Sequence, residues 1–223
     1  MTDFDLPDAN LPDFGLPDFD LPVARNRLNP IPAQLNGDAG RPSAVLVGLT
    51  VKDSQWQVIM TERAHHLAHH AGQISFPGGK VESDDQSLVD TALREAQEEV
   101  DMPSKAVQVL GGLDTVISPV GFIVQPVVGI VAPDTPLVAV PDEVAAVLVL
   151  PLAALVDRSR HRRDSYLRNG QPRQFWVIDH VEHYIWGLSA NILVDLATRI
   201  NGAPDADGAD IGASVTAGDI SRR

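Results

Sequence analysis

Residues 76–102, FPGGKVESDDQSLVDTALREAQEEVDM, join a glycine turn to a helix rich in acidic residues. Apolar residues recur at helical spacing after the turn and predict an amphipathic helix over about residues 84–100. Ser83 and Gln86 have the form of a capping box at its start. The two adjacent glycines before the helix predict a position where the backbone closely approaches another group.

Glutamates gather on one side of this helix. Glu95, Glu98 and Glu99 are spaced so that they lie beside the apolar stripe on neighbouring positions. Three like charges repel one another, and Arg94 supplies only one counter-charge. A divalent cation such as Mg²⁺, which prefers carboxylate oxygens together with substrate phosphates, would neutralise more of the charge. The alternative interpretation is a solvated acidic face.

The rest of the chain predicts more strands than helices, in the mixed class α/β (α+β). A polar turn at residues 52–55 predicts a hairpin between the first two strands. The expected strands are 43–51, 56–61, 73–76, 107–116, 124–131, 144–150, 175–178 and 184–186, and a second helix is expected over 191–200. This order favours a mixed sheet with helices packed on its faces over a doubly wound parallel sheet.

Length and composition allow one globular domain with a tail at each end. The chain has 223 residues, of which 44% are hydrophobic. We expect the domain over residues 25–200. Residues 1–24 form an acidic Leu-Pro-Asp repeat tail, expected to be disordered, and residues 201–223 a second disordered tail rich in Gly, Ala and Asp.

Charge and cysteine content exclude several classes of function. The formal net charge of −13 disfavours nucleic acid as a partner. Because there is no Cys, any metal must bind oxygen or imidazole ligands. No export signal and no run long enough to span a bilayer is visible, so we expect a cytoplasmic protein with no membrane contact.

The glycine turn and the acidic helix together resemble the signature of the Nudix hydrolases. That signature runs Gly, five residues, Glu, seven residues, Arg-Glu-(apolar)-x-Glu-Glu-x-Gly-(apolar). The matching residues are Gly79, Arg94, Glu95, Glu98, Glu99 and Met102. The resemblance implies a Nudix-type mixed β-sheet sandwiched between helices. It also implies that Glu95, Glu98 and Glu99 bind Mg²⁺ or Mn²⁺ or orient water, and that Arg94 braces them.

Residues 63–79, RAHHLAHHAGQISFPGG, resemble a stretch that precedes the signature in the coenzyme A diphosphatase group of this family. This resemblance implies a small-molecule diphosphate substrate, coenzyme A or a derivative, cleaved to 4′-phosphopantetheine and adenosine 3′,5′-bisphosphate. The residues assigned to substrate binding are Arg63, His70, Gln73, Gly78, Gly79 and Lys80. Alternatives are hydrolysis of another nucleoside diphosphate derivative, such as NADH or ADP-ribose, and a non-catalytic nucleotide-binding regulator. A homodimer is left open.

The sequence departs from the family pattern at several positions. Asp101 replaces the Gly of the signature, at a helix end where a left-handed residue is expected. Gln86 has the strict spacing of the first Glu, so Asp85 is the expected substitute. Ala64 and Ala68 replace a Ser and an Arg upstream. Without that Arg, the sequence supports cleavage of a diphosphate linkage more strongly than it supports coenzyme A as the substrate.

A general base must take the proton of the attacking water. The candidates are Glu95 on the helix and Glu143, whose loop precedes a strand and could swing over the metals. Glu143 is favoured, and a plain surface acid is its alternative role.

Two further features suggest ligand contacts. His65, His66, His69 and His70 form i, i+4 pairs that could hold zinc on a helix, but a polar loop near substrate phosphates is favoured. For Trp186, a place in the core is favoured over a platform for adenine.

Overall fold

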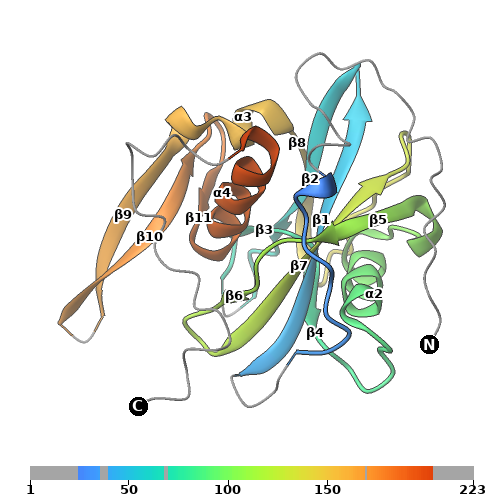
Figure 1. Ribbon diagram of the computed structural model, residues 1–223, viewed down its shortest axis with the longest axis horizontal. Coiled ribbons are helices and arrows are strands. Elements are labelled where there is room, and N and C mark those ends of the chain that lie inside the picture. The colour runs from blue at the N-terminus through green and yellow to red at the C-terminus, as the bar shows by residue number, and fades with distance from the viewer. Residues whose placement is uncertain (1–24, 36–39, 68–69, 169, 203–223) are drawn as a thin grey trace.

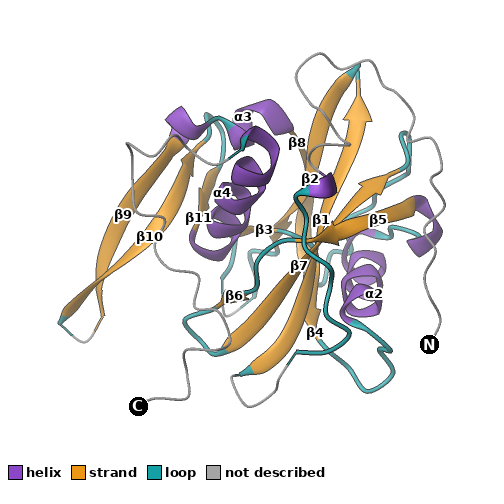
Figure 2. Cartoon of the chain, in the orientation of Figure 1, coloured by secondary structure: helices purple, strands orange, loops and turns teal. Residues whose placement is uncertain are grey.

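The computed structural model describes residues 25–35, 40–67, 70–168 and 170–202. A central sheet lies between helix α2 (Leu88–Val100) and the helices α3 (Leu152–Val156) and α4 (Gly187–Asn201). Figures 1 and 2 show α2 and α4 on opposite sides of the strands. The predicted fold class, a mixed sheet sandwiched between helices, is confirmed.

The central sheet is built around a long first strand. Its strands are β1 (Arg41–Lys52), β2 (Gln55–Arg63), β3 (Ile74–Ser75), β4 (Gly78–Lys80), β5 (Val107–Gly112), β6 (Val116–Ile117), β7 (Phe122–Val131) and β8 (Val144–Pro151). β1 pairs antiparallel with β2 and parallel with β7, so the sheet is mixed. β2 pairs with β8 on its other edge, and β5 and β6 pair with β7.

β1 and β2 diverge toward one end of their hairpin. β1 pairs with β2 over residues 48–52 but with β4 over residues 43–45, on the same edge. β2 pairs with β3 at residues 61–62. The short strands β3 and β4 therefore fill the space between the diverging strands. This arrangement places the glycine turn beside the centre of the sheet, next to α2.

A second sheet contains β9 (His161–Arg168), β10 (Gln171–Asp179) and β11 (Tyr184–Trp186), joined antiparallel in the order β11-β10-β9. Two short 3-10 helices, η2 (Ser104–Ala106) and η3 (Arg158–Arg160), precede β5 and β9. In Figure 1 the β9–β10 hairpin projects from the body of the molecule, and β11 leads directly into α4.

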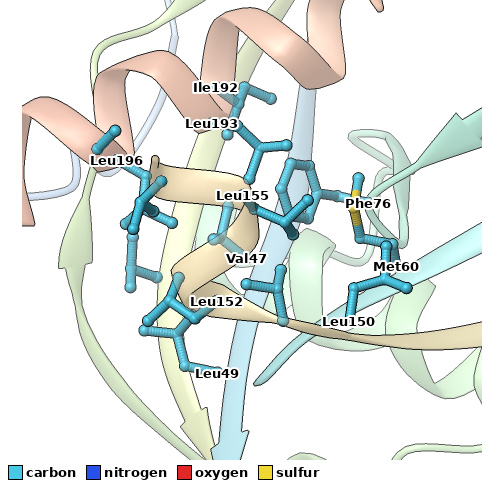
Figure 3. Packing of buried hydrophobic residues seen from close by; sticks show 14 of the residues in the cluster. Val47, Leu49, Met60, Phe76, Leu150, Leu152, Leu155, Ile192, Leu193 and Leu196 are labelled. Atoms are coloured by element: carbon cyan, nitrogen blue, oxygen red, sulfur yellow. The ribbon is translucent and has the colours of Figure 1, made fainter. Parts of the chain in front are cut away.

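The core lies on both faces of the central sheet. Alternate residues of β1 point to opposite sides: Val47 and Leu49 join the cluster beneath α3 and α4, whereas Leu46 joins the cluster beneath α2. Figure 3 shows Val47 beside Leu155 and Leu49 beside Leu152. A strand buried on both faces needs a continuous apolar run, and this explains the composition of β1.

The carboxylate helix begins later than predicted. α2 starts at Leu88, and its N-cap is Ser87, whose hydroxyl accepts a hydrogen bond from the backbone N–H of Asp90. The capping box expected at Ser83 is therefore wrong. The side chain of Gln86 instead donates to the carbonyl of Asp84 at 3.2 Å, within a loop that precedes the helix.

The other predicted elements differ from the observed ones mainly in the second sheet. The hairpin of β1 and β2 is confirmed, with Asp53 and Ser54 at positive φ in its turn. α4 begins at Gly187 rather than at residue 191. The single strand expected over residues 107–116 is two strands, β5 and β6, separated by residues 113–115. Strands β4 and β9 and the short helix α3 were not predicted. β9 is rich in Arg and lacks apolar alternation, so the strand pattern used for the others does not detect it.

The two expected tails, residues 1–24 and 201–223, lie outside the described residues, except for two residues of the second tail. These are Asn201, the last residue of α4, and Gly202, its C-cap. Within the part of the chain that is described, no helix is long and apolar enough to cross a membrane.

Candidate active site

The glycine turn packs directly on the glutamates of α2. The backbone N–H of Gly78 donates to Oε2 of Glu99 at 3.3 Å. A Cβ atom at Gly79 would overlap with the carboxylate of Glu95, and one at Gly78 would overlap with the backbone of β1. Position 78 therefore requires glycine, because a side chain there would overlap with the backbone of β1, and a side chain at position 79 would displace the carboxylate of Glu95.

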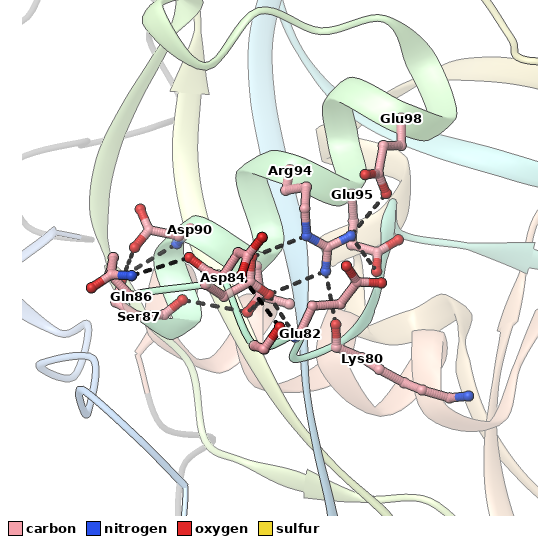
Figure 4. A network of polar contacts seen from close by, with 12 residues as sticks. Lys80, Glu82, Asp84, Gln86, Ser87, Asp90, Arg94, Glu95 and Glu98 are labelled. Carbon is pink, nitrogen blue, oxygen red and sulfur yellow. Dashed lines mark hydrogen bonds and ion pairs between the residues drawn. The ribbon is translucent and has the colours of Figure 1, made fainter.

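Arg94 organises the first part of the cluster (Figure 4). Its Nε donates to Asp85 Oδ1 at 3.0 Å, and its Nη1 donates to Glu95 Oε1 at 3.1 Å and to Glu98 Oε2 at 2.8 Å. Its Nη2 also donates to the carbonyl of Lys80 at 2.8 Å. One guanidinium thus joins the loop after β4 to three carboxylates and fixes their positions.

Asp85, the expected substitute for the first Glu of the signature, binds Arg94. Its side chain is 4% exposed and accepts hydrogen bonds from Arg94, from the hydroxyl of Thr91 at 2.8 Å and from the backbone N–H of Glu82 at 2.9 Å. Burial alone would raise the pKa of Asp85, but these hydrogen bonds outweigh burial and lower it. Asp85 is therefore a charged partner of Arg94, whereas the side chain of Gln86 donates to the carbonyl of Asp84.

Glu99 is the buried carboxylate of the cluster. Burial, together with repulsion from Glu95 and Glu143, raises the pKa of Glu99 to about 8, against the opposing effects of the Gly78 N–H and the charge of Arg63. Burial also raises the pKa of Glu95, which Arg94 opposes. More negative charge is gathered here than the neighbouring cations balance.

The loop that carries Glu143 is fastened to the C-terminal end of α2. The backbone N–H groups of Val138 and Val140 donate to the carbonyls of Val100 and Glu99, each at 3.0 Å. These bonds satisfy helix-end carbonyls that would otherwise lack partners. The expected swinging of this loop is thus opposed by its backbone bonds, and Glu143 is held near Glu95 and Glu99, where its charge acts on both.

Three of these glutamates repel one another: the charge of Glu143 acts on Glu95 and Glu99, and the charge of Glu95 acts on Glu99. The expected ligand Glu98 differs, because its side chain is 56% exposed and turned toward Arg94. Among the described residues no group of three or more His, Cys, Asp or Glu side chains is already arranged to hold a metal ion. The donors nevertheless fit a hard divalent cation in their chemistry, since they are carboxylate oxygens in excess of counter-charge.

The substrate residues expected from the sequence fall into two groups. Gly78, Gly79 and Lys80 lie at the carboxylate cluster. His70 and Gln73 instead line a hollow of about 300 Å³ next to β11.

Arg63 links the two groups. Its backbone N–H donates to the carbonyl of Gln73 at 3.0 Å, and its charge acts on Glu99.

The histidine-rich segment forms turns in its described part, residues 65–67 and 70–72, as the polar-loop interpretation predicts. His65 pairs with Glu62 at 3.2 Å, and His70 lies in the left-handed region with φ 61°. Ala68 and His69 lie outside the described residues. A zinc pair at i, i+4 requires a helix, and the described residues 65–67 and 70–72 form turns instead.

The other wall of the hollow is formed by Glu182, His183, Tyr184 and Trp186, more than a hundred residues after Gln73 in the sequence. Sequence reasoning singled out only Trp186 among these residues. Trp186 is half-buried and lines the hollow, so the favoured place in the core is not where its ring lies. The pairing of β11 with β10 and its contact with β3 help to bring these segments together.

Comparison with known proteins assigns the family. Residues 40–169 match the profile of the NUDIX domain. A protein of Salmonella paratyphi B (strain ATCC BAA-1250 / SPB7), named Uncharacterized Nudix hydrolase NudL, is 45% identical over 164 residues, which cover 74% of this chain and 85% of that protein. The chain belongs to the Nudix family and is a hydrolase of phosphorus-containing anhydrides. As a family, Nudix hydrolases use divalent metal ions.

Solved structures of similar proteins include the Nudix hydrolase RenU from M. smegmatis, with a TM-score of 0.45 and 20% identity over 52% of this chain and 74% of that one. They also include the NUDIX domain of Shewanella oneidensis NrtR complexed with ADP ribose, with a TM-score of 0.41 and 22% identity over 54% of this chain and 80% of that one.

Proposed function

We propose that this Nudix hydrolase cleaves the diphosphate linkage of coenzyme A or one of its derivatives, with Mg²⁺ or Mn²⁺, giving 4′-phosphopantetheine and adenosine 3′,5′-bisphosphate. The observation that carries the hydrolysis of a diphosphate is the excess of carboxylates at the glycine turn. Coenzyme A itself is supported by the resemblance of residues 63–79 to the coenzyme A diphosphatase group.

In this proposal Glu95, Glu98 and Glu99 hold the metal. When bound, Mg²⁺ or Mn²⁺ supplies charge screening of the diphosphate and lowers the pKa of a bound water. Arg94 keeps Glu95 and Glu98 in place through its hydrogen bonds, and the N–H of Gly78 does the same for Glu99. Glu98 must leave Arg94, at least in part, to act as a ligand.

Glu143 is the proposed general base, with Glu95 as the alternative. Glu143 is exposed, so water reaches its carboxylate, and its anchored backbone keeps it beside the glutamates of α2. Glu95 has lower exposure and already accepts a hydrogen bond from Arg94, which makes its oxygens less available to a proton.

Arg63, His70, Gln73, Gly78, Gly79 and Lys80 are proposed to bind the substrate. The glycines allow the diphosphate to approach the backbone beside Glu95 and Glu99. Arg63 and Lys80 supply positive charge for phosphate oxygens. His70 and Gln73 face the part of the substrate that enters the hollow.

One observation favours a different nucleoside diphosphate substrate, such as NADH or ADP-ribose. The side chain at position 64, where the resembling group has Ser, is a methyl group that is 3% exposed. It offers no hydroxyl to a ligand, so one polar contact of that group is missing here.

The test is an assay of the full chain with coenzyme A, NADH and ADP-ribose, with Mg²⁺ or Mn²⁺. Glu99→Gln should lower turnover of coenzyme A by at least about a hundredfold, because metal-ion catalysis supplies several kcal/mol. Asp53→Asn, a carboxylate-to-amide change in the β1–β2 turn, is the matched control and should leave turnover unchanged.

Two outcomes would contradict the proposal at different levels. Turnover of NADH or ADP-ribose alone would exclude coenzyme A but keep the hydrolysis of a diphosphate. Tight binding of all three compounds without turnover would indicate a nucleotide-binding regulator instead of an enzyme.

A further inference from the structure

The hollow beside β11 is distinct in chemistry from the carboxylate cluster. It lies between residues 70–74 and residues 182–186 and has a volume of about 300 Å³, at the lower end of the range for small-molecule sites. Glu62 completes its wall from the end of β2. The hydroxyl of Ser189, at the start of α4, donates to the carbonyl of Ile74 at 2.9 Å and holds the two sides together.

Aromatic rings form one side of the hollow. Tyr184 and Trp186 stack with their ring centroids 6.3 Å apart and their planes inclined by 30°. Phe175 supports Trp186 from behind through an edge contact at 5.5 Å. Tyr184 is 54% exposed, so a face of this pair is accessible to a planar ligand.

Hydrogen-bonding groups come from both walls of the hollow. The carboxylates of Glu62 and Glu182 are acceptors, and the amide of Gln73 and the imidazoles of His70 and His183 can donate or accept. No Lys or Arg is present among the described residues that line the hollow. A phosphate would be repelled by the two carboxylates and would find no cation to bind.

Arg63 connects the hollow to the carboxylate cluster. The backbone N–H of Gly72 donates to the carbonyl of Arg63 at 2.9 Å, and the N–H of Arg63 donates to the carbonyl of Gln73. The charge of the Arg63 side chain acts on Glu99. The hollow is therefore the compartment that we assign to the group on one side of a diphosphate bound at Glu99.

We propose that this hollow binds the amino-bearing purine base of the substrate, stacked on Tyr184 and Trp186, with the exocyclic amine donating to Glu62 or Glu182. This inference rests on the proposed function, since it assumes a nucleoside diphosphate derivative at the carboxylate cluster. A planar base with N–H donors satisfies both walls. The pantetheine arm carries amides but has no ring to stack on the aromatic pair, and a terminal phosphate is disfavoured by the acidic lining.

The experiment measures binding of AMP to the full chain in the presence of EDTA, where no hydrolysis takes place, by the change in tryptophan emission. Tyr184→Ala should weaken AMP binding by at least about fivefold, because stacking of a base on an aromatic side chain is worth about 1–3 kcal/mol. Leu167→Ala is the control. Leu167 is an exposed apolar residue of β9 in the same sheet, 75% exposed, and lies outside the lining, so its loss should leave AMP binding unchanged.

Two further ligands identify the group that is bound. Inosine monophosphate, which lacks the amine, should bind more weakly than AMP in the parent chain. Phosphopantetheine should bind equally to the parent chain and to Tyr184→Ala.

Failure to bind AMP, equal effects of Tyr184→Ala and Leu167→Ala, or an effect of Tyr184→Ala on phosphopantetheine alone would overturn the inference. These outcomes are separate from the hydrolysis assay. AMP bound at Tyr184 without diphosphate cleavage would reject the proposed function but keep the base site, whereas cleavage without AMP binding would do the reverse.

Discussion

Helices α2 and α4 each carry an arginine at the centre of a polar network, and the two networks differ in charge balance. The side chains of Arg94 and Arg199 are 22% and 21% exposed. Arg199 pairs with two carboxylates, Asp114 at 2.7 Å and Asp195 at 3.1 Å, and donates to the carbonyl of Arg27 at 2.8 Å. These bonds join α4 to the segment before β1 and to the loop after β5.

Around Arg94 the carboxylates outnumber the cations. It pairs with Asp85, Glu95 and Glu98, while Glu99 lies next to them under the glycine turn. Burial does not distinguish the two arginines, but the number of carboxylates around them does. Arg199 has two carboxylate partners, whereas Arg94 has three and a fourth carboxylate, that of Glu99, lies beside them. The larger excess of negative charge makes the network of Arg94 the candidate for binding a cation.

The largest expected effect is the loss of activity when Arg94 is removed. Arg94→Ala should lower the turnover of a diphosphate substrate by at least about a hundredfold, because mispositioning catalytic groups by about 1 Å can have an effect of this size. Arg94→Lys should restore little of the loss, since an ammonium group cannot reproduce the fork that serves three carboxylates. Steady-state kinetics at saturating metal measure both variants, and full activity of Arg94→Lys would contradict the positioning role.

The next effect is a pH dependence of stability in EDTA-treated protein. Glu99 keeps its proton up to a pKa of about 8 in the folded chain but ionises near 4.5 when unfolded. Between these values the folded state binds more protons, so the free energy of unfolding falls as pH rises from about 5 to about 8, by an amount on the order of a few kcal/mol. Urea unfolding across this range measures the slope.

Glu99→Gln provides the control for that slope. Other titrating groups, such as the histidines with lowered pKa, contribute to both proteins, so the difference between the parent chain and the variant isolates Glu99. The variant should show a flatter decline. Parallel pH profiles for the two proteins would show that Glu99 is not buried as described.

Arg199→Ala should affect stability and leave chemistry nearly unchanged. Removing the guanidinium leaves Asp114 and Asp195 without their shared cation and releases the carbonyl of Arg27. We expect a loss of about 1–3 kcal/mol in the free energy of unfolding, because charge-assisted hydrogen bonds in a partly buried site are broken. Urea unfolding and kcat, measured side by side, test this, and a loss of kcat comparable to that of Arg94→Ala would remove the distinction between the two networks.

The smallest effect concerns the ends of the same two helices. The C-cap of α4 is Gly202, with φ 83°, whereas the C-cap of α2 is Asp101, which is in the left-handed conformation with φ 53°. Asp101→Gly should stabilise the protein by less than about 1 kcal/mol, because glycine adopts this conformation without strain. The lost hydrogen bond from Gln97 Nε2 to Asp101, at 2.8 Å, offsets part of the gain. Thermal unfolding measures the change, and a clear decrease in Tm would show that the Gln97 contact outweighs the strain.

The sequence predicted the central sheet and the carboxylate helix because their signals are local. These signals are the β-branched-rich runs of β1 and β2, the glycine turn, and the spacing of Glu95 and Glu99, and each spans only a short stretch of sequence. The start of α2 was missed because Ser83 and Ser87 both precede an acidic or amide residue at the spacing of a cap. The bonds of Asp85 to Arg94 and Thr91 hold the intervening residues in a loop.

The hollow could not be predicted because its two walls are brought together only by tertiary structure. Tyr184 and Trp186 have no sequence relation to Gln73, and β11 is three residues long. The basic strand β9 gave no apolar pattern, although the Asn-Gly pair at residues 169–170 is a hairpin signal in the sequence. Recognising that pair would have predicted the second sheet, but not its position beside the loop before β3.

The backbone bonds from Val138 and Val140 to the end of α2 have a consequence for local unfolding. The last turn of the helix cannot fray without also releasing the segment that leads to Glu143, so the two form one cooperative unit. Amide hydrogens of both segments should exchange with solvent at matching rates. Any opening that displaces Glu99 would then displace Glu143 together with it, and the protein would lose a proposed metal ligand and its proposed base in a single event.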